Sequence, residues 1–285
     1  MNPAFVVLVN HSAAAEQAAR YAAVLGGPLG VQLELVHVYQ DPMLLSEMAF
    51  APVPYLPQLQ SDADEALQAL AERLPAAEAT VLAAPMPYAV QEAIDRFQPL
   101  LLAMSLSAEQ GLADYLLRNH LLPVLRATHH PLLLVPETGP PPALPRRVLV
   151  AVDAEYFALS AASLALAPLL ASWPAAFSVV HVRHIASGFE QPVPERLGGS
   201  LRELLPVPAP LELCGDAGHD PAAAVLRAVA DAQADLLVLI ARPRSFLGRL
   251  FHRSVTAEVL RGCPVPVLLL PADAPDQPDW MPAMS

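Results

Sequence analysis

The sequence predicts an α/β protein built from two copies of one parallel-sheet domain. In the second half, the apolar run Leu236 to Ala241, a helical stripe and the run Val265 to Leu270 have the form of a strand–helix–strand unit. The same pattern occurs about half a chain earlier, between Pro99 and Pro136. Because short, wholly apolar runs are typical of strands buried on both faces, these strands are expected to lie parallel.

The beginnings of the two copies repeat as well. The strand FVVLV is matched by RVLVAV, and each is followed by a helix and by a strand with the same triplet, Val36-His37-Val38 and Val180-His181-Val182. A period of about half the chain indicates a duplicated domain. We therefore expect a first domain over 1–138, a proline-rich linker over 139–146, a second domain over 147–272 and a disordered tail over 273–285.

The composition of the chain argues against several classes of partner and of chemistry. The chain has 285 residues and a net charge of −12, which disfavours nucleic acid and anionic membrane surfaces as partners. No apolar run reaches the length of about 18 residues that a membrane helix needs. Two cysteines in different elements suggest no disulfide framework, so a cytoplasmic location is expected. All basic residues are arginines, which excludes lysine-based chemistry.

In the first half, the pattern of apolar and turn residues predicts three strands and three helices before the repeated unit. The strands are 5–9, 31–39 and 80–84, and the helices are 13–25, 62–74 and 88–97, the first of them capped at Ser12. The segment 52–57 holds three prolines, which exclude a regular helix there. It is either a packed irregular connection or a mobile lid or partner-docking loop.

The second half follows the same order. Strands are expected at 147–152, 177–184 and 211–214, and helices at 160–172, 196–205 and 222–232. Asp220-Pro221 is a helix start, with the aspartate as cap and the proline at the first helical position.

This order of elements, with the repeated V-H-V strand and the strand–loop–helix–strand finish, resembles the universal stress protein family in tandem form. The resemblance covers nearly the whole chain. It implies two doubly wound, five-stranded parallel sheets of order 3-2-1-4-5, each with helices on both faces. Single-domain members commonly dimerise through their last strands. We therefore expect Leu132 to Val135 and Val267 to Leu270 to join the halves as a pseudo-dimer, since each is an edge that needs cover.

Many members of that family bind ATP through a G-x2-G-x9-G-[ST] loop, whereas others lack the loop and bind no nucleotide. In the second half, the three glycine positions fall at Ile240, Pro243 and Arg253, so no glycine is present. Glycines matter there because backbone N–H groups must approach the phosphates closely. In the first half, Asn10 replaces the strand-end aspartate, and Arg118 and Asn119 take the last two loop positions.

The second half keeps only some of the residues that would bind a nucleotide. By the resemblance, an aspartate there serves the ribose, a valine lies near the adenine, and arginine forks suit phosphate. These candidates are Asp153, Val182, Arg244, Ser254 and Val255, with Arg242 and Arg253 beside them. The alternative is that Asp153 and Ser254 only cap helices and that the arginines are solvated.

Catalysis and metal binding have little support. Ser12 with His11, and Ser254 with His252, are sequence neighbours, an arrangement that does not orient a nucleophile against a base. A metal site has weak candidates at the carboxyl ends of two strands, with spacings that match no zinc signature. They are His184, Cys214 and His219, together with His181 and Asp216.

The sequence thus predicts a non-catalytic stress-response or regulatory protein that acts through protein contacts, has no cofactor and has lost its ATP loop. The alternative is an adenine-nucleotide sensor that uses the second domain only. In the first reading the partner is an unknown protein, and a further homodimer stays open.

Overall fold

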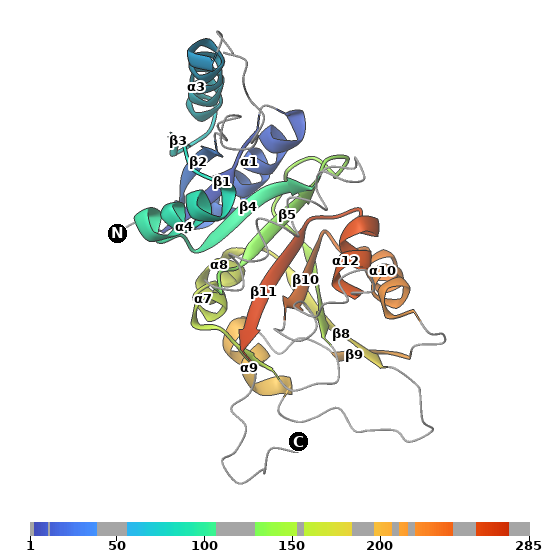
Figure 1. Ribbon diagram of the computed structural model, residues 1–285. Helices are drawn as coiled ribbons and strands as arrows, with labels where there is room; N and C mark the ends of the chain where they lie inside the picture. The colour runs from blue at the N-terminus through green and yellow to red at the C-terminus, as the bar shows by residue number, and fades with distance from the viewer. Residues whose placement is uncertain are drawn as a thin grey trace, which may run out of the picture.

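The computed structural model shows one long, mostly parallel sheet with helices on both faces (Figure 1). It describes residues 3–10, 12–38, 56–106, 129–152, 157–183, 197–206, 211–215, 220–241 and 255–273.

The first half has the strand order predicted from the family resemblance. Its strands pair in parallel in the order β3-β2-β1-β4-β5. Their bounds are β1 Ala4–Leu8, β2 Gln32–Val38, β3 Ala77–Leu82, β4 Leu101–Leu106 and β5 Leu132–Pro136. The helices are α1 Ala13–Gly26, the short 3₁₀ helix η1 Gly27–Leu29, α3 Leu56–Glu72 and α4 Met86–Phe97.

The second half repeats this arrangement. Its strands pair in parallel in the order β9-β8-β6-β10-β11, which is again 3-2-1-4-5. They are β6 Arg147–Val152, β8 Ala176–Arg183, β9 Leu211–Gly215, β10 Leu236–Ala241 and β11 Val267–Asp273. The helices are α7 Ala161–Leu164, α8 Ala167–Ser172, α9 Leu197–Leu204, α10 Pro221–Asp231 and α12 Val255–Gly262.

The expectation of two separate sheets is wrong, because the last strands of the halves pair with each other. β5 and β11 run antiparallel, with Leu133 in register with Leu268, and this joins the two five-stranded halves into one mixed sheet. Figure 1 shows β4, β5, β11 and β10 following one another across this junction. The pairing confirms the prediction that the last strands cover each other's edges.

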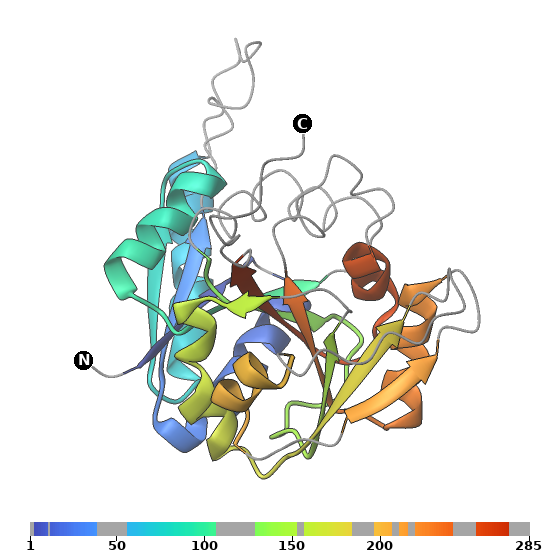
Figure 2. The ribbon, with the colours of Figure 1, turned by 90° about the horizontal axis from the view of Figure 1, so that it is seen from below.

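Two hydrophobic clusters fill the two faces of the sheet. Alternate strand residues point to opposite sides, so Phe5 and Val7 belong to one cluster and Val6 and Leu8 to the other. The cluster of Phe5, here called the junction core, includes residues of α1, α3, α8 and α9. The other cluster includes residues of α4, α10 and α12. Figure 2 shows the strands of the second half between α9 on one side and α10 and α12 on the other.

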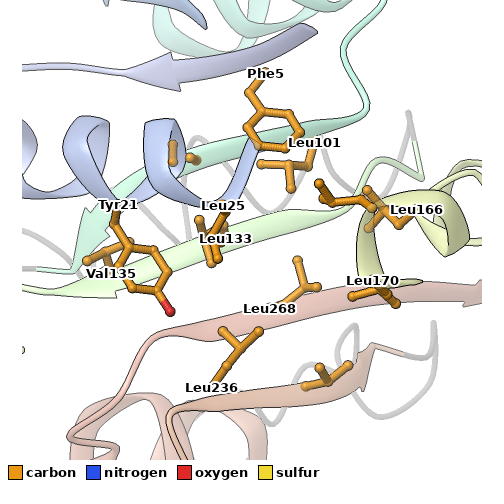
Figure 3. Close-up of a cluster of buried hydrophobic side chains, with 14 of the residues drawn as sticks. Phe5, Tyr21, Leu25, Leu101, Leu133, Val135, Leu166, Leu170, Leu236 and Leu268 are labelled. Atoms are coloured by element: carbon orange, nitrogen blue, oxygen red, sulfur yellow. The ribbon is translucent and has the colours of Figure 1, made fainter. Parts of the chain in front are cut away.

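The junction core is continuous across the two halves. Figure 3 shows Leu25 and Leu133 of the first half gathered with Leu170 and Leu268 of the second. At its rim, the indole Nε1 of Trp173 donates a buried hydrogen bond of 3.0 Å to the carbonyl oxygen of Leu25. The halves therefore share one hydrophobic core on this face.

The helix predicted over 160–172 is interrupted. α7 ends at Leu164, and α8 begins at Ala167 with Pro168 in its first turn. Proline has no backbone N–H, and its ring clashes with the carbonyl four residues earlier, so a helix tends to break there. Before α7 lies β7, Ala158–Leu159, which pairs antiparallel with the last two residues of β11.

Two other predicted boundaries are also corrected. α3 begins at Leu56 and includes Pro57, because a proline in the first turn needs no N–H bond within the helix. β11 runs to Asp273, one residue into the predicted tail. The rest of segment 52–57, the helix expected between β4 and β5, and 274–285 lie outside the described residues. The domain boundaries themselves stay a prediction.

Candidate functional site

The candidate site of each half lies at the carboxyl ends of its parallel strands. In both halves the strand order reverses between the first and the fourth strand, that is between β1 and β4 and between β6 and β10. Open α/β sheets bind ligands in the crevice outside the carboxyl ends of the strands at such a switch point. The two halves place different residues there.

In the first half, Asn10 is turned into the start of α1. Its Oδ1 accepts a hydrogen bond of 3.2 Å from the backbone N–H of Ser12 and lies within hydrogen-bond distance of the Ser12 hydroxyl. The Ser12 Oγ in turn accepts from the backbone N–H of Ala15 at 3.2 Å, so Ser12 is the N-cap of α1, as predicted. This edge thus presents a neutral amide whose oxygen is already used by the turn.

The histidine of the first V-H-V triplet also serves this edge. The Nδ1 of His37 lies 2.9 Å from the carbonyl oxygen of Val9, which links the end of β2 to the end of β1. With Nδ1 as the donor, the hydrogen bond fixes the ring beside the end of β1. Arg118 and Asn119 lie outside the described residues.

In the second half, most predicted nucleotide-binding residues lie outside the described part of the chain. These are Asp153, Arg244 and Ser254, with Arg242 and Arg253. Val182 lies in β8, in register with Cys214 of β9, and Val255 is the exposed first residue of α12. The structure therefore positions the ends of the strands that would carry the site, while the site residues themselves stay a prediction.

Ile240 stands at the first glycine position of the family motif, as aligned to the second half, and lies within the described residues. It lies near the end of β10, in register with Leu270 of β11, and is partly buried against the junction core. A side chain with two substituents on Cβ thus occupies a place where the family loop has a glycine. Close approach of a ligand phosphate to the backbone requires the absence of such a Cβ.

The segment that follows β6 contains a short strand, β7, that is not among the strands predicted from the sequence. Phe157 is buried in the junction core, and β7 is held to β11 by strand pairing and by a hydrogen bond of 3.1 Å from Ser160 N to Pro271 O. Ser160 also donates through its hydroxyl to the carbonyl oxygen of His129, at 3.2 Å. The short apolar run Phe157-Ala158-Leu159 was the available sequence signal for this strand.

The metal candidates are not brought together by the part of the fold that is described. His184, His219 and Asp216 fall outside it, and of Cys214 only the position in β9 is given. His181 is buried in β8, in register with Leu213 rather than with Cys214. Among the described residues no group of three or more histidine, cysteine, aspartate or glutamate side chains is arranged to hold a metal ion.

Two described titratable groups with shifted pKa values, Tyr21 and Cys263, lie away from the carboxyl ends of the strands. Burial raises the pKa of the Tyr21 hydroxyl, and the Asp235 carboxylate across the junction raises it further. Burial also raises the pKa of Cys263, a free buried thiol, which keeps it a protonated, unreactive group. Neither group is placed for nucleophilic or acid–base work at the candidate site.

Comparison with known proteins identifies the family. The model of the universal stress protein family matches residues 1–136 and 216–271. The chain belongs to the universal stress protein family. The two matched segments, one in each half, agree with the tandem form predicted from the repeats.

Solved structures agree with this assignment at the level of the fold. A universal stress protein from Archaeoglobus fulgidus is 18% identical, with a TM-score of 0.67 over 94% of this chain and 96% of that one. A protein of unknown function from Pseudomonas aeruginosa is 15% identical, with a TM-score of 0.59 over 94% and 92% of the two chains. No curated protein sequence matches the chain. No described helix of this universal stress protein has the length and apolar character of a membrane span.

Proposed function

We propose that this universal stress protein is a non-catalytic regulator of the stress response that acts through protein contacts in the cytoplasm and binds ATP weakly or not at all. Membership of the family supports the stress-response role. The observation that carries the rest of the proposal is Ile240, which fills the first glycine position of the family loop with a side chain packed on the core.

The remaining loop positions point in the same direction. Pro243 has no backbone N–H to donate, and Arg253 places a long side chain at the third glycine position. One lost hydrogen bond to a charged group costs roughly 1.5–3 kcal/mol. Two such losses would weaken nucleotide binding about a hundredfold or more.

The first half supports the proposal independently. A carboxylate at the end of the first strand would offer two acceptor oxygens to a ribose, whereas Asn10 has one, which accepts from Ser12. We therefore assign no nucleotide to the first half.

The alternative is an adenine-nucleotide sensor that uses the second half only. It is favoured by Asp153 and Ser254, which match the family's ribose and phosphate positions, and by the arginines around them. The positive charge of Arg253 would then bind phosphate in place of the backbone N–H groups that the glycine loop provides in other members of the family.

Isothermal titration calorimetry with ATP and Mg²⁺ separates the two functions, with thermal shift as a second readout. A ligand at about 100 times its Kd stabilises a protein by about 2.7 kcal/mol, so micromolar binding would be plain at millimolar ATP. We expect no saturable heat and no shift in Tm. Micromolar affinity that is abolished in Asp153→Ala and unchanged in the matched variant Asn10→Ala would refute the proposal and establish the sensor.

The non-catalytic part of the proposal needs its own measurement. Phosphate release from ATP is expected to equal the rate in buffer. Release that depends on enzyme concentration and is lost in Asp153→Ala would show an ATPase instead.

A further inference from the structure

Glu34 is a buried carboxyl group within the sheet of the first half. It lies in β2 with 5% of its surface exposed, between Val6 of β1 and Glu78 of β3, which are both in register with it. β3 is the outer strand of the sheet on this side. Glutamate is rarely this buried unless it is paired, so the position calls for a physical account.

The hydrogen bonding of Glu34 is incomplete. Oε1 accepts a hydrogen bond of 3.1 Å from the side-chain amide of Gln32, two residues earlier on the same face of β2. Oε2 is buried and has no hydrogen-bond partner in the described structure. An ionised carboxylate with a buried, unsatisfied oxygen is costly, whereas the protonated form carries no net charge to desolvate.

The charged groups around Glu34 come from two elements. β3 contributes Glu78, directly beside it, and the last turn of α4 contributes Arg96; β1 contributes only the apolar Val6. Burial raises the pKa of Glu34 most, the negative charge of Glu78 raises it further, and Arg96 lowers it in part. The surroundings therefore favour the protonated carboxyl.

The second half does not repeat this pair. When the V-H-V triplets are aligned, Ser178 of β8 takes the place of Glu34. The carboxyl pair is thus a property of one edge of the sheet and not of the fold as such. The other half serves as an internal reference.

We propose that Glu34 and Glu78 form a proton-sensitive clasp, which holds β3 and α4 tightly on β2 while Glu34 is protonated and loosens when Glu34 loses its proton to solvent. Opening of this edge brings Glu34 into water, where it titrates as an ordinary glutamate. Because the closed edge binds the proton more tightly than the opened edge does, rising pH favours opening.

The direction and size of the effect follow from linkage. A glutamate whose pKa is raised in the closed state contributes stability that is fully present below about pH 4.3, where an unfolded glutamate titrates. That stability is lost as pH rises through the higher pKa of the closed state. With one proton involved, the opening equilibrium changes by at most about tenfold per pH unit over that interval.

Hydrogen exchange measured by mass spectrometry tests the clasp on the full chain. Exchange is followed between pH 4.5 and 8, with each rate corrected for the intrinsic pH dependence of amide exchange. In the wild-type protein we expect protection over 77–82 and 86–97 to fall as pH rises, while protection over 176–183 and 221–231 stays constant.

Three variants decide what causes the change. Glu34→Gln keeps the shape and the bond with Gln32 but does not titrate, so protection of the edge should stay high at every pH. Glu78→Gln removes the neighbouring charge and should shrink the dependence. Glu72→Gln, an exposed carboxylate of α3, should behave as the wild type does.

Protection that does not vary with pH in the wild-type protein would overturn the proposal. So would a dependence that persists in Glu34→Gln. If Glu34→Gln failed to fold by circular dichroism, an undiminished dependence in Glu78→Gln would be the refuting result.

Discussion

We predict that the two halves unfold together, because the junction core contains residues of both. Leu133 is fully buried at the centre of the β5–β11 pair, in register with Leu268 of the other half. Leu133→Ala removes side-chain atoms that contact both halves and leaves a cavity between them. For a fully buried leucine this costs about 2–5 kcal/mol, and here the loss should fall on the whole molecule.

Urea unfolding followed by two probes measures this effect. Circular dichroism reports the helices and strands of both halves, and in a Trp280→Phe background Trp173 is the remaining tryptophan and reports the junction. We expect both probes to give one coincident transition. Leu133→Ala should lower its midpoint and leave the m-value unchanged, since the surface exposed on unfolding stays the same.

Two control substitutions make the experiment decisive. Leu29→Ala, at a residue with 36% exposure, should change the free energy of unfolding by no more than about 0.5 kcal/mol. Leu67→Ala, in α3 of the first half, should move the same single transition as Leu133→Ala does. Two separate transitions, with Leu67→Ala moving only one of them, would refute cooperative unfolding.

Further predictions concern single side chains. Trp173→Phe leaves the buried carbonyl of Leu25 without its donor and should lower the free energy of urea unfolding by about 1–3 kcal/mol. Asp220→Ala removes the 3.0 Å hydrogen bond from the backbone N–H of Ala223 to the capping side chain and should lower the free energy of unfolding by about 0.5–2 kcal/mol. Asp220→Asn can still accept this hydrogen bond and should keep most of that free energy. Glu34→Gln should raise Tm more near pH 7.5 than near pH 4.5, because the raised pKa keeps more of the wild-type carboxyl protonated at the lower pH; an equal gain in Tm at both values would contradict this.

Much of the fold could be predicted because its signals are local and occur twice. Apolar runs such as Leu236 to Ala241 identify buried strands, and the strand found there has the predicted bounds. The helix start at Asp220-Pro221 is confirmed, with the aspartate accepting from Ala223 N and the proline in the first turn. The strand order came from the family resemblance, since neither periodicity nor composition specifies which strands are neighbours.

What the sequence did not predict depends on contacts between distant segments. The break between α7 and α8 combines Pro168 with the hydroxyl of Ser163, which donates to the carbonyl oxygen of Pro271 at 2.8 Å. β7 pairs with the part of β11 that extends past Leu132, the first residue of β5, where backbone groups of β11 still need partners. The buried Glu34 breaks the apolar pattern of β2, and only the register with Glu78 reveals what surrounds it.

The candidate site was predicted less completely for a different reason. Weak or absent nucleotide binding was predicted there from residues that are absent, namely the glycines of the family loop. At Ile240 the structure adds a positive observation, because this side chain packs on the junction core instead of leaving the backbone bare. The loop from Arg242 to Ser254 stays a prediction.

Because the two halves differ in sequence, a contact across the junction need not occur twice. In a symmetric dimer the same residues face each other across the axis, so any contact occurs twice. Here Trp173 donates to the carbonyl of Leu25, whereas the corresponding carbonyl of Leu169 accepts from Ser172 Oγ within its own helix, at 2.6 Å. At the place of Trp173 the first half has Leu29, which is 36% exposed. A symmetric pair of first halves would not supply this donor to the carbonyl of Leu25, so this hydrogen bond belongs to the pairing of two different halves.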